Sequence, residues 1–208
     1  MDNFCKICFK RIDDFSLYNF INKHNVLCED CFSKLKAEFI NFKIGQTKGT
    51  SIYEYTDTLK ELIYKYKGCS DYELKDVFLY RYLNYLRLKY RGYHIVYIPS
   101  YHIDDEKRGF NHVKEIFKSL KLKELDALKK ISAHKQSSQS SKNRRMINNV
   151  IQIDENVLLK GKKILLVDDI MTTGSTLLTS IELLKKQGAK KIEVLVIAKT
   201  KKKTKDEY

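Results

Sequence analysis

One segment of the sequence joins an apolar run to two acids and a turn of hydroxyl residues. It reads Ile-Leu-Leu-Val-Asp-Asp-Ile-Met-Thr-Thr-Gly-Ser-Thr from Ile164, so that Asp168 and Asp169 follow the apolar run directly. Carboxylates at the carboxyl end of a strand in a parallel sheet lie in the crevice where such sheets bind ligands. There they can bind the hydroxyls of a sugar or a hydrated Mg²⁺.

The turn after the acids has the composition of a phosphate site. It consists of Thr172, Thr173, Gly174, Ser175 and Thr176, and a helix is predicted to begin within it. The first N–H groups of a helix have no intrahelical acceptor, and with the helix dipole they favour a phosphate. Glycine lets the backbone approach the ligand closely. An ordinary strand-to-helix turn with capping hydroxyls is the alternative.

Four cysteines near the start of the chain have the spacing of metal ligands. Cys5 and Cys8 form one Cys-x₂-Cys pair, and Cys28 and Cys31 form a second pair after an interval of 19 residues. This spacing is typical of a four-thiolate zinc site, in which no position is left open for water, so we predict a structural zinc ion. A module this small needs its metal in order to fold. Two disulfides, disfavoured in the cytosol, or a redox-active pair are the alternatives.

Basic residues are in large excess, with 40 Lys and Arg against 26 Asp and Glu and a formal net charge of +14. Such an excess favours polyanionic partners, although a compositional bias towards lysine would produce the same number. The segment from Lys129 to Asn149 contains no acid, and we expect it to be a solvated loop. Lys107 and Arg108, next to Gly109 in a predicted loop after a strand, are interpreted either as a mobile basic clamp on phosphates or as a solvated charge pair.

The elements that must position these residues can be read from apolar periodicity. A strand over 163–167, a helix over 175–187 and a strand over 192–198 predict a parallel βαβ unit. Upstream we expect a strand over 51–55, a helix from Leu59 to Gly68 capped by Asp57 or Thr58, a second helix from Asp71, a strand over 94–98 and a helix capped by Asn111. The polar stretch over 44–51 is predicted to be a linker.

The length of 208 residues, of which 43% are hydrophobic, fits one α/β domain with a small appendage. The longest apolar run, Val194 to Ala198, is far shorter than the ~20 residues of a membrane span. The first residues have neither the basic nor the apolar region of a signal peptide. We therefore expect a cytoplasmic protein without membrane insertion.

The segment from Asp168 to Thr176 resembles the 5-phosphoribosyl-1-pyrophosphate (PRPP) motif of type I phosphoribosyltransferases. Together with the preceding cysteine module it is similar to the ComF family of competence proteins. Further stretches agree with that family: Ser51-Ile-Tyr-Glu-Tyr55 with the helix ending at Lys67-Gly68, Arg108-Gly-Phe-Asn111, and Gln139 followed by Arg144, Arg145 and Asn148. The sequence departs from the family at two points. Pro99 is the only proline before the Arg-Gly-Phe-Asn segment, where the family commonly has two, and His112 occupies a position where the family commonly has Gln.

The resemblance implies a phosphoribosyltransferase-like α/β fold, with a parallel sheet flanked by helices and a small N-terminal zinc-binding module of four cysteines. The implied domains are residues 1–43 (zinc module), 51–200 (phosphoribosyltransferase-like domain) and 201–208 (basic tail). Asp168, Asp169 and Arg108 would be catalytic. PRPP, accompanied by Mg²⁺, would be bound by Asp168 and Asp169 at the ribose, by Thr172 to Thr176 at the 5′-phosphate, and by Lys67 at a phosphate. Single-stranded DNA would be bound by Lys107, Arg108, Lys135, Arg144 and Arg145.

Three functions are compatible with these residues. The first is a DNA-uptake protein of natural competence whose domain binds PRPP and single-stranded DNA, with a competence helicase or another uptake protein as a partner. The second is an active phosphoribosyltransferase that acts on a nucleobase or another acceptor. The third is a regulator that senses PRPP and acts through a protein partner. The sequence does not specify an oligomeric state.

Overall fold

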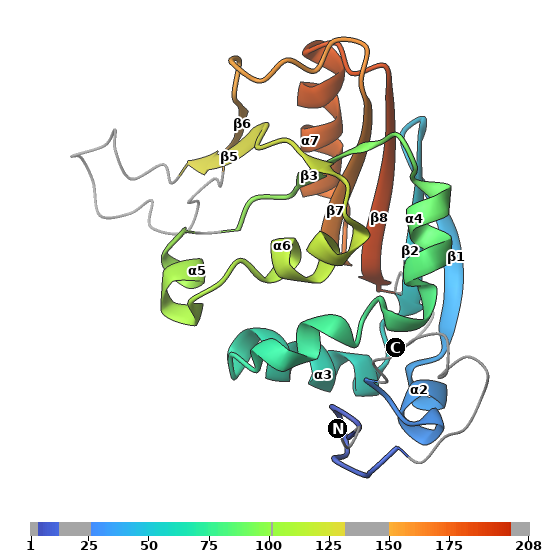
Figure 1. Ribbon diagram of the computed structural model, residues 1–208. Coiled ribbons are helices and arrows are strands. Elements are labelled where there is room, and N and C mark those ends of the chain that lie inside the picture. Colours follow the sequence, from blue (N-terminus) through green and yellow to red (C-terminus); the bar gives the residue numbers. More distant parts are fainter. Residues whose placement is uncertain (1–3, 13–25, 101, 132–149, 201–208) are drawn as a thin grey trace, which may run out of the picture.

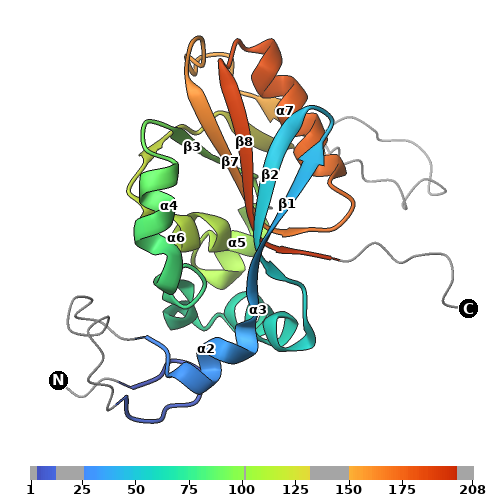
Figure 2. The same ribbon diagram turned by 90° about the vertical axis from the view of Figure 1, so that its right-hand side faces the viewer.

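The computed structural model describes residues 4–12, 26–100, 102–131 and 150–200. Its centre is a six-stranded sheet in the order β1-β2-β8-β7-β3-β4 (Figures 1 and 2). The strands are β1 (Ala37–Ile44), β2 (Thr47–Glu54), β3 (His94–Tyr97), β4 (Lys123–Glu124), β7 (Lys163–Met171) and β8 (Lys191–Lys199). Only the β1–β2 pair of this sheet is antiparallel. A separate ribbon pairs β5 (Leu128–Ile131) with β6 (Val150–Ile153), so the first residues of the loop predicted over 129–149 are strand instead.

Helices cover both faces of the large sheet. They are α2 (Glu29–Leu35), α3 (Asp57–Gly68), α4 (Leu83–Lys89), α5 (His102–Arg108), α6 (His112–Phe117) and α7 (Ser175–Lys186), with short 3₁₀ turns η1 (Tyr72–Asp76), η2 (Tyr80–Tyr82) and η3 (Lys118–Leu120). On one face, α7 packs Ile181 and Leu184 into a core with Val194 and Val196 of β8. The opposite face is covered by α3, α4 and α6, whose apolar residues share a second core with Leu195. Figure 2 shows α7 and α4 on the two sides of the sheet.

The predicted βαβ unit is confirmed. β7 and β8 are parallel, with Leu166 opposite Val194 and Asp168 opposite Val196. β7 continues past the predicted end at 167, so that both acids belong to the strand itself. The α/β class with a parallel sheet is therefore correct. Among the described residues, no helix combines the length and the apolar character that a bilayer crossing requires.

The predicted linker over 44–51 is wrong, because most of it is strand β2. β1 and β2 form a hairpin, and β2 then pairs in parallel with β8. The segment is polar in sequence, yet Thr47, Thr50 and Ser51 are buried. Gly49 lies directly beneath the Phe42 ring, where an added Cβ would come within 2.2 Å of a ring carbon. All but the last residue of β1 falls within the span assigned to the zinc module, whose boundary at residue 43 stays a prediction.

Two local predictions upstream also need correction. The residue that caps α3 is Thr56 rather than Asp57 or Thr58, since its Oγ1 accepts from Leu59 N–H at 3.3 Å. The long helix expected from Asp71 is broken into η1, η2 and α4. At the break, the Tyr53 hydroxyl donates to the Phe78 carbonyl at 2.9 Å, which gives that carbonyl a partner outside a helix.

Candidate functional site

The two acids lie at the carboxyl end of β7, and they face opposite sides of the sheet because side chains alternate along a strand. Asp168 points to the same face of the sheet as Leu166, two residues earlier. Leu166 packs in the core under α7, so Asp168 lies on the face that carries α7 and the hydroxyl-rich turn before it. Asp169 points to the same face of the sheet as Val167, which packs in the core with α3 and α6. The carboxyl edge of the sheet is therefore acidic on both of its faces.

The two carboxyl groups have opposite electrostatic environments. Burial and the neighbouring charge of Asp169 raise the pKa of Asp168 well above its usual value. Burial also acts to raise the pKa of Asp169, but the His112 hydrogen bond and the Lys67 charge outweigh it and hold that pKa below its usual range. Asp169 is accordingly the member of the pair that carries the negative charge most readily.

Asp169 is held by two residues from distant parts of the sequence. Lys67, in the last turn of α3, places Nζ 2.5 Å from Asp169 Oδ2. His112, the first residue of α6, places Nε2 3.4 Å from the same oxygen. The other oxygen, Oδ1, accepts from Ile170 N–H at 2.7 Å. The Asp169 side chain is only 10% exposed, so these contacts take place largely away from water.

Arg108 joins this cluster from the other side of His112. Its Nη1 donates to Asp105 Oδ1 at 2.9 Å and contacts His112 Nδ1 at 3.0 Å, and its Nε donates to the Lys67 carbonyl at 3.0 Å. Arg108 and Lys107 belong to α5 rather than to the loop predicted for them. Lys107 is exposed, whereas the Arg108 side chain is 11% exposed and directed inward. Contact of Arg108 with DNA stays a prediction.

The segment around Arg108 is anchored by Asp105. Its Oδ2 accepts from Asn111 Nδ2 at 2.8 Å and from the Ser100 hydroxyl. Asn111 in turn caps α6, as predicted, because its Oδ1 accepts from Lys114 N–H at 2.8 Å. These bonds fix the start of α6, and with it the position of His112, relative to α5.

The hydroxyl-rich turn leaves the N-terminus of α7 accessible. Gly174 adopts a left-handed conformation, with φ of +78°, and occupies the cap position without any side-chain cap bond. Thr172, Thr173, Ser175 and Thr176 are exposed. A cavity of about 190 Å³ adjoins the turn and is lined by Ser175, Thr176 and Thr179 together with Lys130 and Ile151 of the β5–β6 ribbon. N–H groups, hydroxyls and a lysine thus surround a space that fits an anion.

The four N-terminal cysteines form one cluster of free thiols that could hold a metal ion. Their sulfur atoms all lie within 4.8 Å of one another, and the Sγ atoms of Cys8 and Cys28 are 3.7 Å apart. A tetrahedron with Zn–S bonds of about 2.3 Å has S–S edges of about 3.8 Å, so the spacing fits zinc. Burial and the neighbouring sulfurs raise the pKa of Cys31, a penalty that a bound cation removes by stabilising thiolates.

Charged contacts dock the cysteine cluster onto the large domain. Lys6 Nζ lies 2.9 Å from Glu73 Oε2 and 2.8 Å from Asp76 Oδ2, both in η1. Arg81 pairs with Glu29 at the start of α2. Cys5 and Cys31 are buried in the same core as the residues of α3.

The structure brings together several residues that the sequence only suggested separately. Asp169 and Lys67 are in direct contact, and Arg108 reaches Asp169 through His112. Lys135, Arg144 and Arg145 lie outside the described residues. Asp105 and His112 are parts of the site that were not predicted from the sequence. One signal in the sequence could have indicated them: Arg108 and His112 are four residues apart, at the start of the predicted apolar helix.

The chain has measurable similarity to known proteins. The family model of the phosphoribosyl transferase domain matches residues 106–208. Competence protein ComFC of Streptococcus pneumoniae (strain ATCC BAA-255 / R6) is 29% identical over 196 residues, which cover 94% of this chain and 86% of that protein. Competence protein ComFC of Bacillus subtilis (strain 168) is 28% identical over 155 residues, covering 74% of this chain and 63% of that protein, so less than two thirds of the Bacillus protein is matched.

Among solved structures, adenine phosphoribosyltransferase from Saccharomyces cerevisiae is 16% identical with a TM-score of 0.43, over 83% of this chain and 90% of that chain.

Proposed function

We propose that this chain, which is a ComFC-like protein with a phosphoribosyltransferase-type fold, binds PRPP with Mg²⁺ at the carboxyl end of β7 and handles single-stranded DNA during DNA uptake. The competence part of the proposal is supported by the similarity to two ComFC proteins. The PRPP part is supported by the match to the phosphoribosyl transferase family and by the geometry around Asp168 and Asp169.

The observation that carries the ligand proposal is the junction of an acid pair with an exposed helix N-terminus whose cap residue, Gly174, has no side chain. The turn of residues 172–176 offers N–H groups and hydroxyls to the 5′-phosphate, on the side of the sheet that Asp168 faces. Asp168 and Asp169 offer acceptors to the ribose hydroxyls. Mg²⁺ would neutralise pyrophosphate charge when it enters with the ligand. Lys67 is in direct contact with Asp169, and Arg108 is connected to Asp169 through His112.

PRPP binding is tested by calorimetry with Mg²⁺ on the full chain. Wild-type protein is expected to bind, and Asp168→Asn and a Thr173→Val/Ser175→Ala double variant are expected to bind about 10-fold or more weakly, since each loses hydrogen bonds to charged groups. The exposed Asp104→Asn variant is the matched control and should bind normally. Absence of binding by the folded wild-type protein would refute the proposal.

The DNA part is supported by the net charge of +14 and by the acid-free segment 129–149. Binding to a single-stranded oligothymidylate, followed by fluorescence anisotropy, is expected to weaken steeply with salt as counterion release requires. Arg144→Ala/Arg145→Ala should reduce both the affinity and the salt slope. Lys60→Ala/Lys186→Ala removes the same charge from exposed sites elsewhere and should change both much less. Equal effects of the two double variants would refute a specific role for the 129–149 segment.

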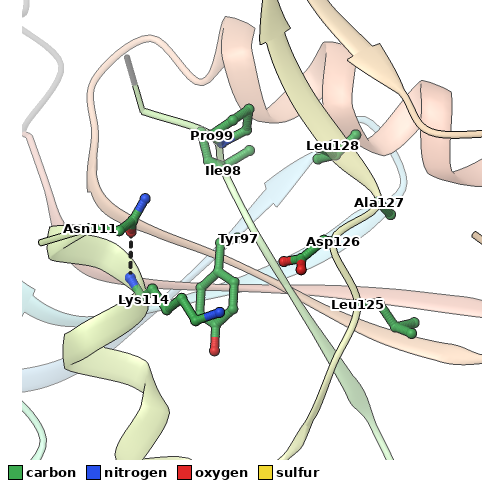
Figure 3. A pocket seen from close by; sticks show the side chains of 9 residues that line it. All are labelled: Tyr97, Ile98, Pro99, Asn111, Lys114, Leu125, Asp126, Ala127 and Leu128. Carbon is green, nitrogen blue, oxygen red and sulfur yellow. Dashed lines mark hydrogen bonds between the residues drawn. The ribbon is translucent and has the colours of Figure 1, made fainter. Parts of the chain in front are cut away.

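A second function, phosphoribosyl transfer to a small acceptor, is favoured by a cavity at the end of β3, the strand that pairs with β7. It lies between the end of β3, the start of α6 and residues 125–128, and Figure 3 shows Asn111, Lys114 and Asp126 around it. Ile98 in its lining donates its N–H to the Val167 carbonyl at 3.0 Å, directly before Asp168. Its volume of about 130 Å³ is of the same order as the roughly 150 Å³ of a cavity known to bind benzene, so its size is compatible with a small acceptor.

Pyrophosphate release from PRPP separates the two functions. With a panel of nucleobases, and with single-stranded DNA, turnover that Asp168→Asn abolishes would establish a transferase and its acceptor class. PRPP binding without turnover would leave the ligand as an effector of DNA handling. The metal of the cysteine cluster is proposed to be structural zinc, because four thiolates leave no position for a substrate.

A further inference from the structure

The His112 ring lies between an arginine and a carboxylate, and it is buried with a residue exposure of 6%. Its Nδ1 is 3.0 Å from Arg108 Nη1, and its Nε2 is 3.4 Å from Asp169 Oδ2. The backbone at this position is fixed as well, since the Tyr66 hydroxyl donates to the His112 carbonyl at 2.9 Å. The ring therefore connects α5 to β7 in a defined orientation.

The chemistry of the two neighbours determines which ring nitrogen carries the proton. A guanidinium has N–H donors only, so His112 Nδ1 can contact Arg108 favourably only as an acceptor. An ionised carboxylate has acceptors only, so Nε2 must donate to Asp169. One form of the ring meets both conditions, namely the neutral imidazole with its hydrogen on Nε2. The other neutral form, like the imidazolium, would direct an N–H at the Arg108 N–H.

We infer that His112 is a positioning residue that acts as a neutral donor–acceptor bridge between Arg108 and Asp169. By accepting from Arg108 it orients the guanidinium, and by donating to Asp169 it holds the carboxylate ionised and aligned. Two further charged groups lie around the bridge. Asp105 Oδ1 is 3.9 Å from His112 Nδ1, beyond hydrogen-bond distance, and pairs instead with Arg108 Nη1 at 2.9 Å, so Arg108 stays the hydrogen-bond partner of Nδ1. Lys67 pairs with Asp169 at 2.5 Å. The part of this inference that concerns ligand affinity rests on the proposed function.

A glutamine amide has the same order of groups, with an oxygen that accepts and a nitrogen that donates. His112→Gln should therefore preserve the bridge, whereas His112→Leu fills similar space without either polar group. This pair of variants separates a hydrogen-bonding role from a packing role. A residue needed only for packing would be replaced better by leucine than by glutamine.

The direct test is the protonation pattern of the ring in the ligand-free full-length protein. Long-range ¹H–¹⁵N correlation spectra distinguish the two neutral tautomers and the imidazolium, and the chain has 5 histidines, of which His112 is assigned by its disappearance in His112→Gln. At pH 7 the Nε2–H tautomer is expected. A ring with its hydrogen on Nδ1, or a ring with both nitrogens protonated, would overturn the inference whatever PRPP does.

The functional test compares PRPP affinity by calorimetry. His112→Leu is expected to weaken binding about 10-fold or more, the effect of losing a hydrogen bond to a charged group, while His112→Gln should stay close to wild type. Equal loss in both variants would overturn the bridge. If the wild-type protein does not bind PRPP, the proposed function fails while the tautomer measurement still decides the inference. Circular dichroism of both variants confirms that they are folded.

Discussion

Replacing Asp168 by asparagine is expected to stabilise the fold and to weaken the site at the same time. Burial and the charge of Asp169 raise the pKa of Asp168, so the ionised side chain is unfavourable in the folded protein. In the wild-type protein, Asp168 Oδ1 accepts from Asp169 N–H at 2.9 Å, and the oxygen of an asparagine side chain can accept the same hydrogen bond. Asparagine carries no charge, so the repulsion between the two carboxylates is removed. Substitutions that relieve such functional strain commonly contribute about 0.5–2 kcal/mol.

For a chain of 208 residues, a gain of about 1–2 kcal/mol raises the Tm by about 2–8 °C. The gain also has a defined pH dependence. A group whose folded pKa is raised lowers stability at pH values above its unfolded pKa, so the advantage of Asp168→Asn should be largest at neutral pH. It should shrink as the pH falls through the raised folded pKa and disappear below the unfolded value of about 3.9.

Thermal and urea denaturation at pH 7.5, 5.5 and 4 measure this difference for wild type, Asp168→Asn and the exposed control Asp104→Asn. The control should change the Tm little at any pH. A lower stability of Asp168→Asn at neutral pH, or a gain that does not decline with acidification, would refute the electrostatic interpretation of the acid pair.

Three further outcomes are expected. Purified protein should contain about one zinc ion per chain by elemental analysis, and Cys28→Ser should lose it together with several degrees of Tm; metal-free wild type of unchanged Tm would contradict this. Lys67→Met should cost about 1–3 kcal/mol in urea denaturation, because the buried Asp169 loses its closest cation. Since Lys67 helps to keep the pKa of Asp169 low, its contribution is present above the unfolded pKa and should vanish as the pH falls through the folded pKa; a pH-independent loss would contradict it. Gly49→Val should cost about 1–3 kcal/mol through overpacking against the Phe42 ring, and combining it with Phe42→Ala should recover part of that loss if the clash is its cause.

Apolar patterning predicted the part of the fold that carries the acids. The apolar runs over 164–167 and 194–198 are continuous because these parts of β7 and β8 are buried on both faces, and the helix between them has an apolar stripe. The β1–β2 hairpin escaped prediction because Thr47 to Ser51 is polar by composition. Its burial depends on pairing with β8, which is distant in sequence, and on Phe42 covering Gly49.

The site could be predicted only as separate pieces. Local sequence identified Asp168, Asp169 and the hydroxyl turn, because strand, acids and helix start are consecutive. Lys67 and Asp169 are 102 residues apart, and their contact depends on how α3 packs on the sheet. Arg108 likewise points inward because it belongs to α5 and donates to Asp105. The segment was predicted to be a loop, and a loop implies neither the helix nor this hydrogen bond.

Asp169 is already paired with Lys67, so a ligand that binds this carboxylate has to compete with the lysine. A sugar hydroxyl carries no positive charge, so replacing Lys67 at Asp169 Oδ2 by a hydroxyl alone would leave an ammonium group without its partner. A ligand that also carries an anionic group can pair with the displaced lysine, and in the proposed function pyrophosphate supplies that group. PRPP satisfies both requirements, whereas ribose 5-phosphate lacks the second anion. If PRPP displaces Lys67 as proposed, His112 would remain beside Asp169 and would keep the carboxylate hydrogen-bonded and ionised during the exchange.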